Sequence, residues 1–456
     1  MTALIYPNTA FAAEAEAFLS AYPQTQNLDT LFADINGILR GKQMPAASLV
    51  KLGSKGVNYP LSTLVLDCQG RMIAEALEDG LDGDPDRTYY PVSGSLRPVP
   101  WADKPTAQIM MAAAEPDGRP LFCDPRAVLQ RAAQPLADLG LTPVMALELE
   151  FYLFDPSNLP PKPVGPLNGF PAMTGPQCLS SDGLADFACF MREVDDVTAA
   201  QGIPMTSILC EYGDGQFEAN LKHVADPVAA CDDAVALKRA VRAIARKRGL
   251  IASFMAKPRS DQTGSGLHIH MSLLDRDGRN MFSGSEGQKR LRHAIGGTLA
   301  AMPESVALMA PAANSYRRFQ PGAFAPVSPI WGVNHRAVSV RVPLSADADS
   351  RFEHRPAGAD ACPYLVAAVL LASAHYGLVN NCDPGPMVEE GARAQLGQPF
   401  PNRWGEALST LAQGKILKPY LGEKFVEVFL GVKRDEEARF HSEVSDRDYA
   451  WYLRVM

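Results

Sequence analysis

The segment at residues 147–154 reads LELEFYLF and alternates apolar with polar side chains. Glu148, Glu150 and Tyr152 occupy even positions, whereas the odd positions hold only leucine and phenylalanine. Side chains two residues apart lie on the same face of a β-strand. We therefore predict a strand that carries two carboxylates on one face and four apolar side chains on the other.

Four later segments repeat this alternation, at residues 216–221, 267–273, 337–342 and 351–355. For any one of them, an antiparallel strand with one solvated face is the ordinary explanation. Solvated faces usually carry Lys, Thr and Ser, whereas these five faces concentrate Glu, His and Arg. We predict that the strands form one curved sheet whose polar face encloses a charged funnel.

Six candidate metal ligands lie on or next to these strands: Glu148, Glu150, Glu211, Glu218, His268 and Glu353. Carboxylates at close range repel one another, and burial adds to the pressure on them to take up protons. Divalent cations would remove this conflict. A mainly carboxylate set with one imidazole suits Mg²⁺ or Mn²⁺, and the ligands are numerous enough for two ions.

A group of arginines follows in the same part of the chain: Arg317, Arg318, Arg336, Arg341, Arg351 and Arg355. Guanidinium groups bind phosphate and carboxylate through paired hydrogen bonds. Arginines beside two metal ions would form a site for phosphoryl transfer, which depends mostly on positioning and charge neutralisation. Surface ion pairing is the alternative for each arginine taken singly, and the alternation with valines weakens that alternative for Arg341.

The composition and the missing motifs exclude several classes of protein. The 456 residues are 46% hydrophobic and carry a net charge of −8, so we expect a packed core and no nucleic acid or membrane as partner. No P-loop, Rossmann fingerprint or nucleophile elbow occurs. The scattered cysteines favour free thiols and a cytoplasmic location. The longest apolar stretch, residues 363–379, predicts a buried helix.

Turn and cap residues indicate how the chain is organised. Prolines recur between residues 98 and 125 and mark a division. Upstream we expect a small, mostly β domain with short strands at residues 30–35, 62–66 and 72–76. Downstream, capping signals predict three helices, which run from Asp124–Pro125 to Gly140, from Asp226–Pro227 to Gly249, and from Asp360 to Gly377.

The chain resembles the glutamine synthetase superfamily through seven motifs in the family's order. They are LELEFYLF (147–154), EYGDGQFEAN (211–220), FMAKP (254–258), GSGLHIH (264–270), NSYRRFQPG (314–322), NHRAVSVRVP (334–343) and RFEHR (351–355). The first half resembles the γ-glutamylputrescine synthetases of that superfamily, through YPQTQ (22–26), DINGILRGK (34–42), DPDRT (84–88) and GSL (94–96).

This resemblance implies an α+β fold and a ring assembly. An N-terminal β-grasp domain would cover residues 1–115. A glutamine-synthetase-type catalytic domain, with a curved antiparallel sheet flanked by helices, would cover residues 116–456. The assembly would be a homo-oligomer, usually a dodecamer of two hexameric rings with each site between neighbouring subunits.

The resemblance also implies roles for the motif residues. Glu150, Glu211 and Glu218 resemble the ligands of a metal ion beside the amino-acid substrate. Glu148, His268 and Glu353 resemble the ligands of a metal ion that bridges the ATP phosphates. Gly264 and Arg318 resemble residues that hold glutamate. Arg336, Arg341 and Arg355 resemble arginines around the transferred phosphate, while Arg351 and His270 resemble contacts near the nucleotide.

Two positions depart from the ammonia-using members. Those enzymes place a glutamate before Ala-Pro after the NSY-R-x-x-PG run, where this chain has Phe324. They also carry an Asp-Gly-Ser-Ser segment that binds ammonium, whereas the matching residues 59–63 contain no acid. A phenyl ring favours an alkyl chain, by roughly 0.8 kcal/mol per buried methylene. We therefore expect the nucleophile to be an organic primary amine, bound in part by Phe324.

These features predict an ATP-dependent ligase that joins the γ-carboxylate of L-glutamate to a primary amine, above all putrescine or a polyamine, through a γ-glutamyl phosphate. It would need two or more Mg²⁺ or Mn²⁺ ions per site. The alternatives are a γ-glutamyl ligase for a monoamine or ethanolamine, a glutamine synthetase that uses ammonia, and an inactive relative that binds metabolites. A guanidino kinase has a related catalytic fold, but the β-grasp-like first half argues against it.

The substitution Phe324→Glu tests the choice of nucleophile. We expect it to lower the use of organic amines and to introduce the use of ammonium, because it restores a carboxylate and removes the apolar ring. Phosphate release with each nucleophile at fixed glutamate and ATP measures both effects. Undiminished amine use without any ammonium use would show that position 324 does not set the preference.

Overall fold

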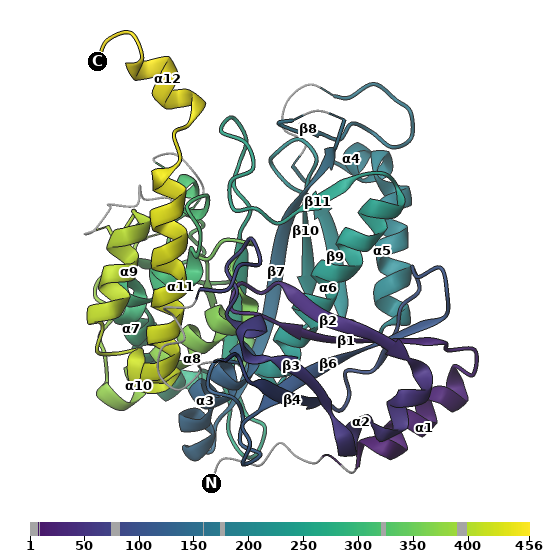
Figure 1. Ribbon diagram of the computed structural model, residues 1–456. Helices are drawn as coiled ribbons and strands as arrows, with labels where there is room; N and C mark the ends of the chain where they lie inside the picture. Colours follow the sequence, from purple (N-terminus) through teal and green to yellow (C-terminus); the bar gives the residue numbers. More distant parts are fainter. Residues whose placement is uncertain are drawn as a thin grey trace.

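The computed structural model of this chain describes residue 8 and residues 10–73, 83–157, 159–173, 178–320, 325–389 and 399–456. Phe324 lies outside the described residues, as does most of the strand expected at residues 72–76. The described chain forms two sheets with helices around them (Figure 1).

The first sheet has six strands in the order β2-β1-β6-β4-β3, with β5 paired to β6. Its strands are β1 (Asn27–Ala33), β2 (Leu39–Pro45), β3 (Val57–Pro60), β4 (Asp86–Pro91), β5 (Arg97–Pro98) and β6 (Thr106–Ala114). The parallel pairing of β1 with β6 places the first and last strands side by side. With helices α1 (Phe11–Ala21) and α2 (Leu49–Lys55), this is the expected β-grasp arrangement.

The second sheet has nine strands in the order β13-β14-β15-β12-β7-β10-β9, and β8 and β11 also pair with β7. Its strands are β7 (Thr142–Asp155), β8 (Lys162–Pro163), β9 (Met205–Cys210), β10 (Gln216–Leu221), β11 (Ile251–Ser253), β12 (Leu267–Leu274), β13 (Trp331–Val333), β14 (Val340–Val342) and β15 (Phe352–His354). All its pairs are antiparallel except β13 with β14. The five alternating segments therefore lie in one sheet, as predicted.

Helices flank the second sheet and fill the space beside it (Figure 1). They are α3 (Pro125–Asp138), α4 (Ser181–Asp186), α5 (Ala188–Ala200), α6 (Pro227–Lys247), α7 (Gly284–Met309), α8 (Pro363–Asn380), α9 (Trp404–Gln413), α10 (Lys418–Leu421), α11 (Glu423–Ser442) and α12 (Asp446–Tyr452). The helix α6 packs on β7, β10 and β11, and α3 packs on α8. The helix α12 projects away from the body in this view.

The two sheets share a core. One cluster of buried side chains includes Phe32 of β1, Phe151 of β7 and Val241 of α6. Asp29 of β1 also accepts a hydrogen bond from the Nη2 atom of Arg239 in α6, at 2.6 Å. Because the core is continuous, the division at residue 115 stays a prediction.

The capping signals gave correct starts for two helices. Asp124 accepts the backbone N–H of Arg126, and Asp226 accepts those of Val228 and Ala229. A carboxylate at this position satisfies N–H groups that the first turn leaves free. The helix expected from Asp360 to Gly377 was placed three residues too early, because Pro363 occupies its first turn and Cys362 its N-cap.

Three expected strands differ from the structure. The strand β1 ends at Ala33 because Asp34 turns the chain, accepting the backbone N–H groups of Asn36 and Ile38 at 2.9 Å. The segment 62–66 instead begins in a 3₁₀ helix at Leu61–Leu64, where Ser62 bonds to the Asp84 carboxylate. In the segment 337–342, only Val340–Val342 pairs as a strand.

The helix α8 is long and apolar enough to cross a membrane by composition, yet 72% of that stretch is buried inside the protein. It packs on α7 at a close crossing. A Cβ atom on Gly297 of α7 would lie 2.2 Å from the Ser373 carbonyl oxygen and 2.4 Å from the Gly377 Cα. The α8 helix therefore has the burial expected of a core helix.

The substitution Gly297→Ala tests this crossing. We expect it to destabilise the fold by about 1–3 kcal/mol, because the added methyl group meets backbone atoms that cannot move independently. Thermal unfolding followed by circular dichroism measures the change. The matched control is Gly165→Ala, where an added Cβ meets nothing within 4 Å. Equal unfolding midpoints for the two variants would contradict the close packing.

Candidate active site

The polar residues of the second sheet are aligned by its strand register. Glu148 of β7 lies opposite His268 of β12, and Glu150 of β7 lies opposite Glu218 of β10. Glu353 of β15 lies opposite His270 of β12 on one side and Arg341 of β14 on the other. Residues directly opposite one another share a face of the sheet. The register therefore gathers these side chains on one face, as the alternation predicted.

Glu148 joins the two histidines of β12. Its Oε1 atom lies 2.9 Å from the Nε2 atom of His270, and its Oε2 atom lies 3.3 Å from the Nδ1 atom of His268. Burial raises the pKa of Glu148, but the hydrogen bonds and charges of the two imidazoles outweigh burial and lower it. Glu148 is thus held as a carboxylate.

Glu150, Glu211 and Glu218 form a second group, in which one oxygen from each lies within 4.8 Å of the others. Glu211 follows the end of β9, which lies beside β10. Burial and the charges of Glu148, Glu150 and Glu211 raise the pKa of Glu218 to about 9. Burial and Glu150 also raise the pKa of Glu211. The carboxylate repulsion expected from the sequence is therefore present in the folded chain.

Three overlapping groups on this face have the geometry to hold a metal ion: Glu148, His270 and Glu353; Glu148, Glu218 and His268; and Glu150, Glu211 and Glu218. Hard divalent cations prefer carboxylate oxygens, and an imidazole broadens the choice to Mn²⁺. The raised pKa of Glu218 is a further sign that this donor set fits a cation. The pairing of His268 with Glu148 and Glu353 around one ion stays a prediction.

Arginines border the same face at Glu353. The Nη1 atom of Arg341 lies 2.9 Å from one Glu353 oxygen, and the Nη1 atom of Arg355 donates to the other. Burial raises the pKa of Glu353, but Arg355 and His268 lower it by more. Arg351 adds a donor, since its Nε atom lies 3.4 Å from the Nδ1 atom of His270.

Arg318 lies beneath the face, next to two glycines. Its Nη1 atom donates to the carbonyl oxygens of Pro356 and Ala357 at 2.6 and 3.0 Å. A Cβ atom on Gly264 would lie 2.8 Å from the Arg318 Cγ, and one on Gly266 would lie 2.8 Å from its Nη2. Because Glu150 accepts the backbone N–H of Gly266 at 2.7 Å, Arg318 adjoins the carboxylate group.

Three further residues singled out in the sequence remain to be placed: Arg336, Arg317 and Phe324. Arg336 is exposed, and its charge lowers the pKa of Glu211 against the larger effect of burial, which places it near that carboxylate. Arg317 lies apart from the face, because its guanidinium stacks over the Phe440 ring at 5.5 Å. The predicted role of Phe324 falls outside the described residues.

Sequence reasoning gave no role to Gln216. Its Nε2 atom donates to the Gly264 carbonyl oxygen at 3.0 Å and lies 3.4 Å from Glu150. The side chain thus links the glycine turn to the carboxylates. Its position two residues before Glu218, on the same strand face, was the available signal.

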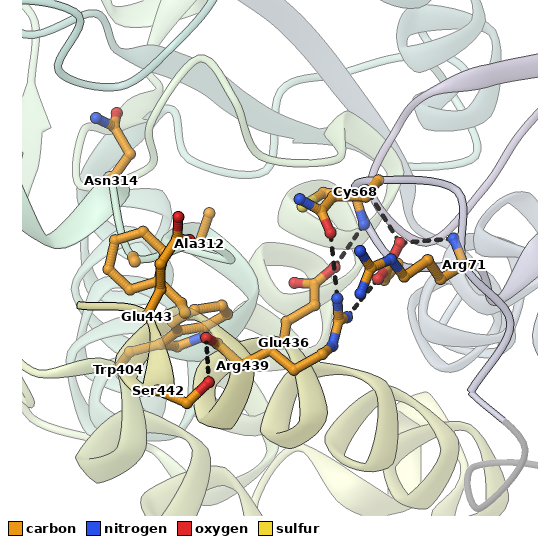
Figure 2. A pocket seen from close by; sticks show the side chains of 13 residues that line it. Cys68, Arg71, Ala312, Asn314, Trp404, Glu436, Arg439, Ser442 and Glu443 are labelled. Atoms are coloured by element: carbon orange, nitrogen blue, oxygen red, sulfur yellow. Dashed lines mark hydrogen bonds and ion pairs between the residues drawn. The ribbon is translucent and has the colours of Figure 1, made fainter. Parts of the chain in front are cut away.

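A separate cavity of about 480 Å³ lies away from these residues. Cys68, Arg71, Trp404, Glu436 and Arg439 are among the residues that line it, and the Cys68 N–H donates to the Glu436 carboxylate at 2.6 Å (Figure 2). Among the described residues, none of the candidate metal ligands or site arginines lines it. We place the candidate active site on the carboxylate face, because the charged and metal-binding groups lie there.

Comparisons with known proteins identify the family of this chain. Residues 122–452 match the family model for the glutamine synthetase catalytic domain. The chain is 40% identical to the γ-glutamylputrescine synthetase PuuA of Escherichia coli K12, over 98% of this chain and 95% of that protein. It is 31% identical to a glutamate–isopropylamine ligase of a Pseudomonas species, over 95% and 96% of the two chains. A solved complex of GmaS with ADP superposes with a TM-score of 0.82 at 25% identity, covering 99% and 100%.

The fold and the site define a glutamine-synthetase-type enzyme, with a β-grasp sheet followed by a curved sheet that carries a carboxylate face. The chain belongs to the glutamine synthetase family. It is an ATP-dependent ligase that joins glutamate to an amine.

The raised pKa of Glu218 gives a prediction for metal binding at pH 7. Glu218 is then protonated in the metal-free protein, so binding of Mn²⁺ should release about one proton from it. The substitution Glu218→Gln imitates the protonated state, and we expect it to leave metal-free stability unchanged while it weakens Mn²⁺ binding. Calorimetric titration in two buffers of different ionisation enthalpy measures both affinity and proton release.

The control for that titration is Glu427→Gln, an exposed residue of α11 outside the carboxylate group. We expect this variant to bind Mn²⁺ and release protons as the unmodified chain does. Equal affinity and equal proton release for Glu218→Gln would contradict the assignment of Glu218 as a ligand.

Proposed function

We propose that the amine substrate is putrescine or a related polyamine, which the enzyme joins to the γ-carboxylate of L-glutamate. The observation that carries the glutamate and phosphate chemistry is the carboxylate face bordered by Arg341 and Arg355. The choice of amine is supported by the 40% identity to a γ-glutamylputrescine synthetase along almost the whole chain. Phe324, in place of the glutamate of ammonia-using enzymes, supports the same choice.

The carboxylates would hold two divalent cations, Mg²⁺ or Mn²⁺. Glu150, Glu211 and Glu218 would hold one beside glutamate, and Glu148, His268 and Glu353 would hold the other beside the ATP phosphates. When bound, these cations neutralise charge on the phosphate oxygens and on the carboxylates themselves. The crowding of these carboxylates, which with burial raises the pKa of Glu218, supports the binding of cations on this face.

Arginine and glycine residues would position the substrates. Arg318 and the backbone of Gly264 would hold glutamate, since the two adjoin each other and Glu150. Arg336 and Arg355 would face the transferred phosphoryl group, with Arg341, Arg351 and His270 on the nucleotide side. The contacts of Arg351 with His270, and of Arg341 and Arg355 with Glu353, support one connected rim.

The reaction would proceed in two steps. A γ-carboxylate oxygen of glutamate attacks the γ-phosphorus of ATP, the bond to the β-phosphate oxygen breaks, and ADP leaves. The amine nitrogen then attacks the acyl carbon, phosphate leaves with the bonding electron pair, and the nitrogen loses a proton as the amide forms. The alkylammonium must first lose a proton, because a primary amine of this kind is mostly protonated near neutral pH.

The assembly would be a homo-oligomer, in the form of a dodecamer of two hexameric rings. The family resemblance supports this arrangement. Each site would then lie between neighbouring subunits, so the residues that bind the amine would come in part from another copy.

Amine-dependent turnover of ATP, measured with different nucleophiles, tests the proposed amine substrate. We expect putrescine to give a kcat/KM about two-hundredfold above that of ammonium, because four methylenes at roughly 0.8 kcal/mol each are removed from water. Isopropylamine and ethanolamine should fall between them. Phosphate release measures the rates, and mass spectrometry of the product confirms the γ-glutamyl amide.

Three outcomes would contradict parts of this proposal. Turnover with ammonium alone would identify a glutamine synthetase. A higher kcat/KM with ethanolamine or a monoamine would replace the proposed amine but keep the ligase. Absence of turnover with every nucleophile, by protein that still binds ATP and Mn²⁺, would favour an inactive relative.

A further inference from the structure

Asp360 lies in the loop between β15 and α8, behind the carboxylate face. Its Oδ2 atom accepts a hydrogen bond from the Ser315 hydroxyl at 2.6 Å. Its Oδ1 atom is buried and, among the described residues, has no hydrogen-bond partner. Burial raises the pKa of this carboxyl group, against the Ser315 hydrogen bond and the charge of Lys238, which lower it.

Ser315 begins the short 3₁₀ helix at Ser315–Arg318. This helix ends at Arg318, the arginine that we propose binds glutamate. Ser315 is buried, and its hydroxyl oxygen also accepts the backbone N–H of Ala312 at 3.1 Å. Its own N–H donates to the Ala312 carbonyl oxygen at 2.9 Å. These three contacts hold Ser315, and Asp360 supplies the only one of them that comes from a distant part of the chain. The preceding residue, Asn314, is held separately by two hydrogen bonds with the Lys257 backbone, each 2.9 Å long.

The loop that carries Asp360 also contacts the other end of the helix. Pro356 and Ala357, in the same loop, accept the hydrogen bonds of the Arg318 guanidinium. The loop is itself joined to β12 and to the turn before it. The Ala357 carbonyl oxygen accepts the N–H of Leu267, and the Ala359 N–H donates to the Ser265 carbonyl oxygen, each at 3.0 Å. One loop therefore holds both the start of the helix and the guanidinium at its end.

A helix cap does not explain the carboxylate at position 360. The helix α8 begins at Pro363 after Cys362, and Asp360 bonds to none of its N–H groups. Burying a carboxylate oxygen without a hydrogen-bond partner is unfavourable, because the lost hydration is not replaced. On α6, the Nζ atom of Lys238 donates to the Ala359 carbonyl oxygen at 2.8 Å, which brings a cation close to Asp360 but does not bond to it. The Ser315 contact is thus the specific bond that this carboxylate makes.

We propose that Asp360 is a positioning residue for glutamate binding, which acts through Ser315 to set the place of Arg318. Asp360 itself does not touch the substrate. Loss of its hydrogen bond would let the 3₁₀ helix shift relative to Pro356 and Ala357, and the guanidinium would leave the place that fits the glutamate carboxylate. This inference rests on the proposed role of Arg318.

Steady-state kinetics with separate titrations of glutamate, ATP and the amine tests the inference on four variants. For Asp360→Ala and Ser315→Ala, we expect the glutamate KM to rise about tenfold, because each loses the same buried hydrogen bond, while the ATP KM stays within about twofold. Asp360→Asn keeps an acceptor for the Ser315 hydroxyl and should keep most of the glutamate affinity. The control is Ser373→Ala; among the described residues, its buried hydroxyl bonds to the Val369 carbonyl oxygen of its own helix.

A purely structural role would lower the unfolding temperature of Asp360→Ala and leave the glutamate KM unchanged, which would overturn the inference. Equal rises in the KM for glutamate and for ATP would overturn it as well. If Asp360→Ala does not fold, Ser315→Ala decides, because it removes the same bond from the other partner. The variant Arg318→Lys distinguishes failure of the role proposed for Arg318 from failure of the proposed function. A normal glutamate KM in that variant would refute the role of Arg318, whereas absence of glutamate-dependent turnover in the unmodified enzyme would refute the proposed function.

Discussion

Mutual repulsion among carboxylates on one face of a sheet is the constraint on which the rest of this structure depends. Burial, together with the charges of Glu148, Glu150 and Glu211, raises the pKa of Glu218 to about 9. Such an arrangement is unfavourable in a protein that has no cation to bind there. The apolar face of the same sheet, packed on α6, holds the strands in register and thereby keeps the carboxylates together.

The negative charge of the carboxylate face is compensated unevenly. Neighbouring groups offset more of it at Glu148 and Glu353 than at Glu211 and Glu218. Glu148 and Glu353 have imidazole and guanidinium partners, which lower their pKa values despite burial. For Glu211, burial and Glu150 outweigh the charges of His268 and Arg336, and its pKa is raised. Burial and the neighbouring carboxylates likewise raise the pKa of Glu218. A nucleotide with its cations fits the first environment, and a cation beside an amino acid fits the second. This asymmetry supports different roles for the two groups.

Much of the site could be predicted from sequence because strand alternation is local. The residues 147–154 and 216–221 show their polar faces by periodicity alone, and the structure aligns them as neighbours. Contacts between distant loops carry no such pattern. The bond from Ser315 to Asp360 spans 45 positions, and a rule based on local caps assigned Asp360 to the start of a helix. Likewise, Arg317 and Arg318 are adjacent in sequence, yet only Arg318 turns towards the site.

The most direct test of this account is a crystal structure of the enzyme with Mn²⁺ and ADP, with anomalous scattering used to locate the metal. We expect two strong peaks on the carboxylate face, one among Glu150, Glu211 and Glu218 and the other beside Glu148 and Glu353, each about 2.0–2.2 Å from carboxylate oxygens. Peaks elsewhere, with these carboxylates free of metal in a complex that contains ADP, would contradict it.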